Sequence, residues 1–269
     1  MDRPPPADHE SPTDPSRMGR ADLKIGRHVR RLRRFWRTIP SAPRCKMCYS
    51  PFGPPGGPLL RYIGKGRWAG NSDYCAGCFK DLYRHRYGAE IECTLFFADI
   101  RGSTQVAEAM SATAYRELLD RFYRTAAQII IDHEAIVDKF VGDEIIGIFI
   151  PALAGDAHAG RAVDAGLELL RATGHDTDAP WAPIGIGINT GEAFVGVVGT
   201  TDHLEFTALG DNVNVTARLA STAGAGEILV TDAAARAAGI SGEHRSLDLR
   251  GKTDTTGVVV LTLETASAR

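Results

Sequence analysis

Two aspartates, Asp99 and Asp143, each stand at the end of an apolar run and beside a turn. Asp99 follows the run 95–98 and precedes a small-residue turn at 102–104, whereas Asp143 lies between two apolar segments. A carboxylate at a strand end can hold a hard cation, and the N–H groups of a turn and of the next helix can hold phosphate oxygens. Asp99 alone fits a helix cap equally well. Two such acids together are the minimum for two-metal chemistry on a phosphate ester.

A second pair of polar residues, Asn214 and Arg218, is spaced i, i+4 in a segment whose helix we expect to begin near Asp211. This spacing places both side chains on one face of the helix. An amide and a guanidinium one turn apart can orient a ribose or a triphosphate and can neutralise developing charge. Taken alone, the pair fits equally well an ordinary helix that is capped at Asp211 and exposes polar residues.

Four cysteines form two pairs, Cys45-x2-Cys48 and Cys75-x2-Cys78, which 26 residues separate. Each pair can place two thiolates on one tight turn, and two such turns can close a tetrahedral four-sulfur site. The Gly- and Pro-rich segment 51–70 between them cannot bury enough apolar surface to fold alone. A bound metal would therefore stabilise it. We favour structural zinc; an iron–sulfur or redox-active centre and unligated thiols remain alternatives. We expect Cys93 to be a buried small apolar residue.

The elements that must position these residues follow from periodicity. Short apolar runs bounded by turns predict strands, and stripes at helical spacing predict helices. In chain order we expect a strand ending at Asp99, two helices after Thr104, a hairpin over 135–150, a helix over 156–172, strands over 184–189 and 193–198 joined by a turn at 190–192, a helix from Asp211, and strands over 227–230 and 258–263. The order β-α-β-β-α-β predicts a ferredoxin-like α+β fold, with a mostly antiparallel sheet and helices on one face, beside a small N-terminal metal-binding module.

Three motifs resemble those of the catalytic domain of class III adenylate and guanylate cyclases, and they occur in that family's order. They are Phe-Phe-Ala-Asp-Ile-Arg-Gly-Ser-Thr at 96–104, Lys-Phe-Val-Gly-Asp-Glu at 139–144, and Phe-Thr-Ala-Leu-Gly-Asp-Asn-Val-Asn-Val-Thr-Ala-Arg-Leu at 206–219. The resemblance covers roughly residues 90–269. It implies the same ferredoxin-like fold and the conversion of a nucleoside triphosphate into a cyclic nucleotide and pyrophosphate.

The resemblance also implies a role for each matching residue. Asp99 and Asp143, with the Ile100 carbonyl, would bind two Mg²⁺ or Mn²⁺ ions in each active site. Lys139 and Thr207 would read the purine, Asn214 would orient the ribose, and Arg218 would stabilise the transition state. The turn residues Gly102, Ser103 and Thr104 would contact the phosphates, and Lys252 would reach the terminal phosphates.

The purine-reading pair points to adenine. Adenine offers an acceptor ring nitrogen and a donor amino group, which fit a lysine donor and a threonine hydroxyl acceptor. Guanylate cyclases of the family typically carry Glu in place of this lysine and Cys or Ser in place of this threonine. In having a threonine at this position, the chain resembles one bacterial-type subgroup of the family. We therefore expect an adenylate cyclase that uses ATP. A guanylate cyclase and a non-catalytic nucleotide sensor on the same fold are the alternatives.

The expected site also requires two chains. Lys139 and Asp143 are four residues apart, roughly 13 Å along a strand, so they are poorly placed to serve one metal–purine site. The family resemblance implies a head-to-tail pair in which one chain supplies both acids and the other supplies Lys139, Thr207, Asn214 and Arg218. Because this chain carries the full set, we expect a homodimer with two shared active sites.

The first ninety residues differ in charge from the rest. Residues 1–90 hold 18 Lys+Arg and 8 Asp+Glu, a balance of +10, whereas residues 91–269 hold 13 and 25, a balance of −12. This asymmetry predicts two functional parts. We divide the chain into a disordered tail (1–20), a basic amphipathic helix (21–43), the four-cysteine module with its connector (44–89) and the cyclase domain (90–269).

The N-terminal segments also bear on location and partners. Residues 1–15 lack the apolar core of a secretory signal, and no apolar run is long enough to span a bilayer, so we expect a cytoplasmic protein. On residues 21–37, a stripe of Ile25, Val29, Leu32 and Trp36 lies beside basic side chains that include Arg33. Packing of this stripe on its own domain or on a partner helix is the simplest expectation. Peripheral attachment to an anionic membrane is a second use, and nucleic-acid contact is disfavoured.

Overall fold

A computed structural model describes residues 29, 31–39, 41–54, 56–68, 74–85, 88–200, 204–249 and 255–267. The expected tail at 1–20, the start of the basic helix at 21–28, and Lys252 lie outside the described residues. None of the described helices is long and apolar enough to cross a membrane.

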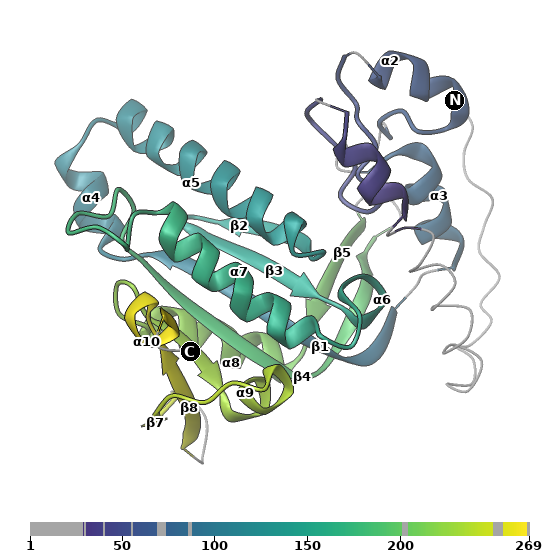
Figure 1. Cartoon of the computed structure of the whole chain (residues 1–269). Helices are drawn as coiled ribbons and strands as arrows, with labels where there is room; N and C mark the ends of the chain where they lie inside the picture. Colours follow the sequence, from purple (N-terminus) through teal and green to yellow (C-terminus); the bar gives the residue numbers. More distant parts are fainter. Residues whose placement is uncertain are drawn as a thin grey trace.

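The centre of the molecule is a sheet of eight strands (Figure 1). The strands are β1 (Gly88–Ile100), β2 (Ile136–Val141), β3 (Glu144–Phe149), β4 (Ile184–Gly199), β5 (Leu204–Leu209), β6 (Ile228–Thr231), β7 (Glu243–Leu247) and β8 (Thr256–Leu261). Their order is β2-β3-β1-β4-β6-β8-β7, and β5 pairs with β4 off this path. Only the β4–β6 pair is parallel among the described strands. The first four strands have the ferredoxin-like order, which confirms the α+β fold expected from the sequence.

The two long helices of the β-α-β-β-α-β unit lie on one face of the sheet, as expected, whereas a helix that follows this unit covers the other face. The cyclase-domain helices are α4 (Ser103–Ala109), α5 (Ala112–Asp132), α6 (Pro151–Ala154), α7 (His158–Ala172), α8 (Asp211–Thr222), α9 (Asp232–Ala238) and α10 (Leu263–Ser267). The main core joins α5, α7 and α9 to one face, where Phe96 and Ala98 point. On the other face, α8 packs through Leu219 in one cluster, while Leu95 and Phe97 contribute to another. Because side chains alternate along β1, this strand contributes residues to the cores on both faces of the sheet.

β4 differs from its expected form, because one continuous strand replaces two strands joined by a turn. Its register with β1 is unbroken from Ile184, opposite Ile100, to Gly196, opposite Gly88. Thr190 and Gly191 stay extended because β1 supplies a hydrogen-bonding partner along this whole length. Residues 194–199 at the end of this strand pair with β5, and residues 194–196 pair with β1 as well, so β4 and β5 form an arm that continues from the main sheet.

A glycine in β4 lets α8 approach the sheet closely. A Cβ added at Gly187 would lie 2.6 Å from the Thr216 carbonyl oxygen and 2.5 Å from the Ala220 nitrogen. Any larger residue would push the helix away from the sheet. The close approach matters because α8 carries Asn214 and Arg218.

The N-terminal module lies beside the β4–β5 arm (Figure 1). It contains α2 (Gly57–Leu60), a short 3-10 helix (Arg61–Ile63) and α3 (Ala76–His85), preceded by helical residues 31–37. Val29 packs against the second core and Trp36 is buried, so the described part of the apolar stripe faces this chain. Arg33, expected among exposed basic residues, is only 1% exposed. It is buried because backbone carbonyls of both the module and the cyclase domain accept its hydrogen bonds.

Candidate functional site

Three carboxylates meet at one end of the β1–β3 pair. Asp99 occupies the next-to-last position of β1 and lies opposite Glu144, the first residue of β3. Asp143 stands in the turn between β2 and β3, where Gly142 adopts a φ of 62° that favours glycine. The turn returns the chain at once, so Asp143 lies beside Asp99. The structure thus brings together the two acids singled out from the sequence.

The electrostatics of this cluster favour a positively charged occupant. Burial raises the pKa of Asp99 to about 7, and the neighbouring Asp143 carboxyl adds to the rise. Burial also raises the pKa of Glu144 to about 7, and the charges of Asp99 and Asp143 contribute. Three acids that repel one another in a half-buried position need a cation to be ionised together.

Two residues that the sequence analysis did not single out hold this cluster in place. Arg101 forms an ion pair with Asp99, and its other amino group donates to the Ser221 and Ala223 carbonyls at the end of α8, over 2.9 and 3.2 Å. Tyr123 on α5 donates its hydroxyl to the Gly142 carbonyl. Arg101 lies two residues after Asp99, and because residues i and i+2 of a strand face the same side, this spacing was a usable signal. Nothing in the sequence pointed to Tyr123.

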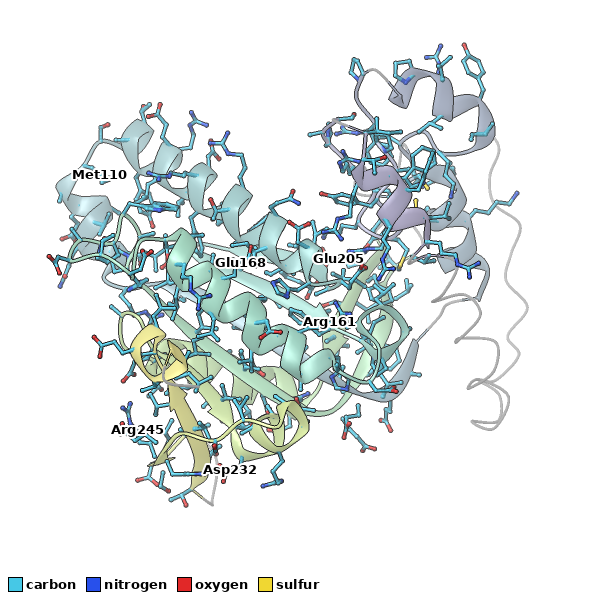
Figure 2. All side chains as sticks on the ribbon, in the orientation of Figure 1. Met110, Arg161, Glu168, Glu205, Asp232 and Arg245 are labelled. Carbon is cyan, nitrogen blue, oxygen red and sulfur yellow. The ribbon has the colours of Figure 1, made fainter. Side chains whose placement is uncertain are left out.

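Lys139 and Thr207, from β2 and β5, are brought to a second location. The Thr207 hydroxyl donates to Oδ2 of Asp138 over 2.7 Å, and both side chains are buried. Lys139 Nζ pairs with Glu205 Oε2 at 3.1 Å and lies 3.9 Å from Asp138 Oδ2. Burial raises the pKa of Asp138, against the opposing effects of Thr207 and Lys139. Figure 2 labels Glu205 on the side of the domain where the N-terminal module lies.

A β-bulge explains how two consecutive residues of β2 reach the same place. The register between β2 and β3 shifts between Val137 and Lys139. In a regular strand, Asp138 and Lys139 would point to opposite faces, whereas a bulge redirects a side chain. The sequence analysis did not single out Asp138, because in a strand with strict alternation its side chain would point away from that of Lys139.

Asn214 and Arg218 lie one turn apart on α8, as their spacing predicted. Asn214 is exposed and Arg218 is partly buried, and Arg218 forms no ion pair with any residue that the structure describes. A buried amide network fixes the start of this helix. Asn212 donates to the Gly191 carbonyl over 2.9 Å and accepts from Asn189, whose own oxygen accepts from Thr231 over 2.8 Å.

The turn after β1 joins the acid cluster to α4. Gly102 adopts a φ of 68°, and Ser103 begins the helix. Burial and the nearby Asp143 raise the pKa of Tyr115, and a hydrogen bond with the Ser103 hydroxyl offsets part of this rise. Ile100 ends β1 with its side chain buried.

The four cysteines form a separate cluster in the N-terminal module. The Sγ atoms of Cys45, Cys48, Cys75 and Cys78 all lie within 4.8 Å of one another, and the thiols are free. Among the described residues, this is the one group that meets such a geometric criterion for a metal site. Contacts with the other thiols lower the pKa of Cys48 and raise that of Cys78, so the four sulfurs compete for protons. Cys93 is fully buried and apart from them, as expected.

Residues 86–262 match the sequence profile of the adenylate and guanylate cyclase catalytic domain. This chain belongs to that family. The chain is similar to the crystal structure of the adenylyl cyclase CyaB from P. aeruginosa, with 27% identity and a TM-score of 0.58 over 65% of this chain and 96% of that one. It is equally similar to a crystallised guanylyl cyclase, with 29% identity and a TM-score of 0.58 over 64% and 92% of the two chains. The fold is therefore that of the cyclases.

Curated relatives match the same region. The terminal-differentiation-specific adenylate cyclase of Dictyostelium discoideum is 36% identical over 129 residues, which are 46% of this chain and 6% of that protein. Adenylate cyclase 1 of Rhizobium meliloti is 30% identical over 134 residues, 48% of this chain and 20% of that protein. The chain thus spans a fifth or less of these two relatives. Cyclase domains bind a nucleotide, use Mg²⁺ or Mn²⁺ and commonly act as dimers.

Proposed function

We propose that this protein is an adenylate cyclase that converts ATP into 3′,5′-cyclic AMP and pyrophosphate. The observation that carries adenine over guanine is the hydrogen bond from Thr207 to Asp138. Because the hydroxyl proton is committed to the Asp138 carboxylate, the oxygen of Thr207 is left to accept. Adenine presents an amino donor on its reading edge, which is what an accepting hydroxyl needs.

Lys139 completes the recognition of adenine. Its ammonium group can donate to the acceptor ring nitrogen of the purine, once nucleotide takes the place of its exposed ion pair with Glu205. Guanine reverses this pattern, since its ring nitrogen donates and its carbonyl accepts. A lysine and a threonine whose hydroxyl donates to Asp138 therefore disfavour guanine, because its ring N–H faces a second donor.

Asp99 and Asp143, with the Ile100 carbonyl, would hold two Mg²⁺ or Mn²⁺ ions. Hard carboxylate oxygens match these metals, and the pKa of Asp99, which burial and Asp143 raise although Arg101 lowers it, fits a site that would hold further positive charge. Bound metal would lower the pKa of the ribose 3′-hydroxyl and neutralise the triphosphate. In this assignment, the ion pair between Arg101 and Asp99 keeps the carboxylate oriented in the absence of nucleotide.

Other residues of this chain would bind and orient the substrate. Asn214, exposed on α8, would hold the ribose, so that the 3′-oxygen faces the α-phosphorus in line with the leaving pyrophosphate. Arg218 would stabilise the charge that builds on the transferring phosphoryl group. The turn at 102–104 would contact phosphate oxygens through its N–H groups. Lys252, outside the described residues, would reach the terminal phosphates.

We further propose a homodimer with shared active sites. Large apolar side chains remain exposed near the purine-reading pair, namely Phe140 (45%), Val141 (52%) and Leu209 (49%). Two of them follow Lys139 directly and the third lies two residues after Thr207. Exposed apolar surface around a functional site favours a protein partner, and a second copy would cover it symmetrically.

The test is incubation of the purified full-length chain with ATP or GTP in Mg²⁺ or Mn²⁺, followed by chromatographic separation of the products. We expect cyclic AMP from ATP and much less cyclic GMP from GTP. Asp99→Ala and Asp143→Ala should each abolish turnover while the dimer persists in size-exclusion chromatography. Cyclic GMP as the main product would establish the guanylate cyclase alternative, and nucleotide binding without either product would establish a sensor.

A further inference from the structure

The four-cysteine cluster has the dimensions of a single-ion site. Cys48 Sγ and Cys75 Sγ lie 3.7 Å apart, one from each Cys-x2-Cys turn. A tetrahedral zinc ion with Zn–S bonds of about 2.3 Å requires sulfurs about 3.8 Å apart. All four sulfurs lie within 4.8 Å of one another. A polynuclear iron–sulfur cluster would hold its ligands farther apart, because the cluster itself lies between them.

The surroundings of the sulfurs also fit a thiolate site. The Cys75 N–H donates to Cys45 Sγ over 3.3 Å, and the Cys78 N–H donates to Cys75 Sγ over 3.4 Å. The ammonium of Lys65 lies 3.9 Å from Cys48 Sγ. These donors offset the negative charge that four thiolates would leave around a divalent ion. Among the described residues, the apolar side chains that pack against Cys45, Cys48 and Cys75 are Met47, Phe52 and the fourth cysteine, so a metal would add to the stability of this module.

The first cysteine turn is attached to β2. Lys46, which stands between the two ligands of this turn, donates its ammonium to the Asp138 carbonyl. The buried Arg33 donates to the Lys46 and Met47 carbonyls over 3.2 and 3.1 Å, and to the Ala135 carbonyl over 2.6 Å. The turn therefore holds both the start of β2 and the residue that orients Thr207.

The second cysteine turn is attached to β5. Tyr74 precedes Cys75 directly, is buried, and accepts a hydrogen bond from the Phe206 N–H over 3.2 Å. β5 pairs with β4 alone among the described strands, so an outward N–H of this edge strand needs a partner from elsewhere. Phe206 is the residue before Thr207. Each cysteine turn thus reaches one of the two strands that carry the purine-reading pair.

We propose that Cys45, Cys48, Cys75 and Cys78 bind one Zn²⁺, and that its presence sets the affinity of the Lys139–Thr207 pair for nucleotide. The proposal rests on the assignment of that pair in the proposed function. Zinc fixes the backbone of both turns, and the turns hold Asp138 and Phe206 through Lys46 and Tyr74. Without the ion, the module loosens and both strands lose a hydrogen-bonding partner. By linkage, bound nucleotide also raises the affinity of the four cysteines for zinc.

Metal content is measured first, by elemental analysis of the full-length protein. One zinc per chain is expected, and replacement by Co²⁺ should give the absorbance of a tetrahedral four-thiolate site. Iron, or no metal at all, would overturn the proposal. Nucleotide affinity is then measured by calorimetry with 3′-deoxy-ATP, which lacks the attacking hydroxyl and reports binding without turnover.

Two variants separate the coupling from metal binding. Tyr74→Phe removes the acceptor for the Phe206 N–H, and Lys46→Met removes the donor to Asp138, while all four cysteines remain. Each lost hydrogen bond should weaken 3′-deoxy-ATP binding by roughly three- to tenfold, with zinc content unchanged. Tyr62→Phe is the matched control, because Tyr62 is 75% exposed in the same module and its hydroxyl accepts only from Arg61 among the described residues. It should bind as the wild type does.

The metal-free protein, prepared by chelation or by Cys78→Ser, should show the same loss of affinity. Its amide hydrogen exchange should rise in β2 and β5 but not in β6 or β8. At equilibrium with a competing chelator, the protein should retain more zinc when 3′-deoxy-ATP is bound. Unchanged affinity and unchanged exchange in the metal-free protein would overturn the coupling. These readouts are independent of turnover, so a protein that fails to cyclise ATP would refute the proposed function and leave the coupling measurable.

Discussion

The hydroxyl of Thr207 on β5 donates to the carboxylate of Asp138 on β2 over 2.7 Å, in a buried contact between residues 69 positions apart. This contact joins the β4–β5 arm to the edge of the main sheet. It also fixes the direction of the one hydroxyl that we assign to purine reading. Lys139, next to Asp138, is thereby placed within the same small region.

Replacing Asp138 by alanine should therefore weaken the choice between ATP and GTP. The freed hydroxyl of Thr207 can then donate as well as accept, so guanine is no longer disfavoured. We expect the ratio of kcat/KM for ATP over GTP to fall roughly three- to tenfold, the value of one hydrogen bond. Asp164→Ala, at an exposed acid on α7, is the matched control. An unchanged ratio in Asp138→Ala would contradict the role given to the contact.

The acid cluster predicts an unusual dependence of stability on pH in magnesium-free buffer. The pKa of Asp99 is about 7 in the folded protein and about 3.9 in an unfolded chain. Between these values the folded state holds a proton that the unfolded state has lost, so the free energy of unfolding falls as pH rises from about 4 to 7. Mg²⁺ should consequently raise the melting temperature more at pH 7.5 than at pH 5.5.

Asp99→Asn provides the comparison, because its amide has no proton to lose in this range. The variant should melt with a shallower pH dependence than the wild type and should respond less to Mg²⁺. Chelators must be avoided in this experiment, since they would also act on the cysteine cluster. Equal slopes in the two proteins would show that the carboxyl of Asp99 is not the titrating group.

The shared active sites predict complementation between two inactive chains. Asp99→Ala removes a metal ligand and Lys139→Ala removes a purine contact, so each homodimer should be inactive. In a mixed dimer, one site draws its acids from the Lys139→Ala chain and its lysine from the Asp99→Ala chain, and is complete. With random pairing about half the dimers are mixed, and each has one working site of two. Co-expression should restore about a quarter of wild-type activity.

Isolation of the mixed dimer makes this result decisive. The two variants can be co-expressed with different tags, and the mixed dimer purified on both. Its activity should be about half that of the wild type, and each homodimer from the same culture serves as a control. No activity in the isolated mixed dimer would place each site within one chain.

We expect Arg33 to be among the single residues that contribute most to the free energy with which the N-terminal module packs on the cyclase domain. Arg33→Met keeps most of the side-chain volume but leaves the carbonyls of Lys46, Met47 and Ala135 without their donor. We expect a loss of about 3 kcal/mol in the free energy of unfolding in urea, the scale of several buried polar groups left unpaired. Arg31→Met, at an exposed residue of the same helix, should change it by less than about 0.5 kcal/mol.

Local sequence was sufficient for the elements that carry the acids. The apolar runs on either side of Gly142 specified the hairpin, since a turn that requires a positive φ stood between them. The run ending at Asp99 specified β1, and the i, i+4 spacing of Asn214 and Arg218 specified a common face of α8. These features depend on residues within a few positions of each other, so they can be read from one stretch of chain.

The cysteine cluster was also evident from spacing, since two Cys-x2-Cys turns restrict where their sulfurs can lie. Spacing could not say what the cluster contacts. The attachment of Lys46 to Asp138 and of Tyr74 to Phe206 joins segments 92 and 132 residues apart. No periodicity within either segment encodes such a pairing.

The sequence by itself determined the residue types of the site, the hairpin, the helix face and the ferredoxin-like order of the first strands. Only the tertiary structure decided that 184–199 is one strand, because its extension depends on the partner that β1 offers along its whole length. Only the tertiary structure placed Asp138 beside Thr207, since that needs both a bulge in β2 and the return of β5 on its arm. Only the tertiary structure buried Arg33, whose charge predicts a surface position and whose carbonyl partners come from two separate parts of the chain.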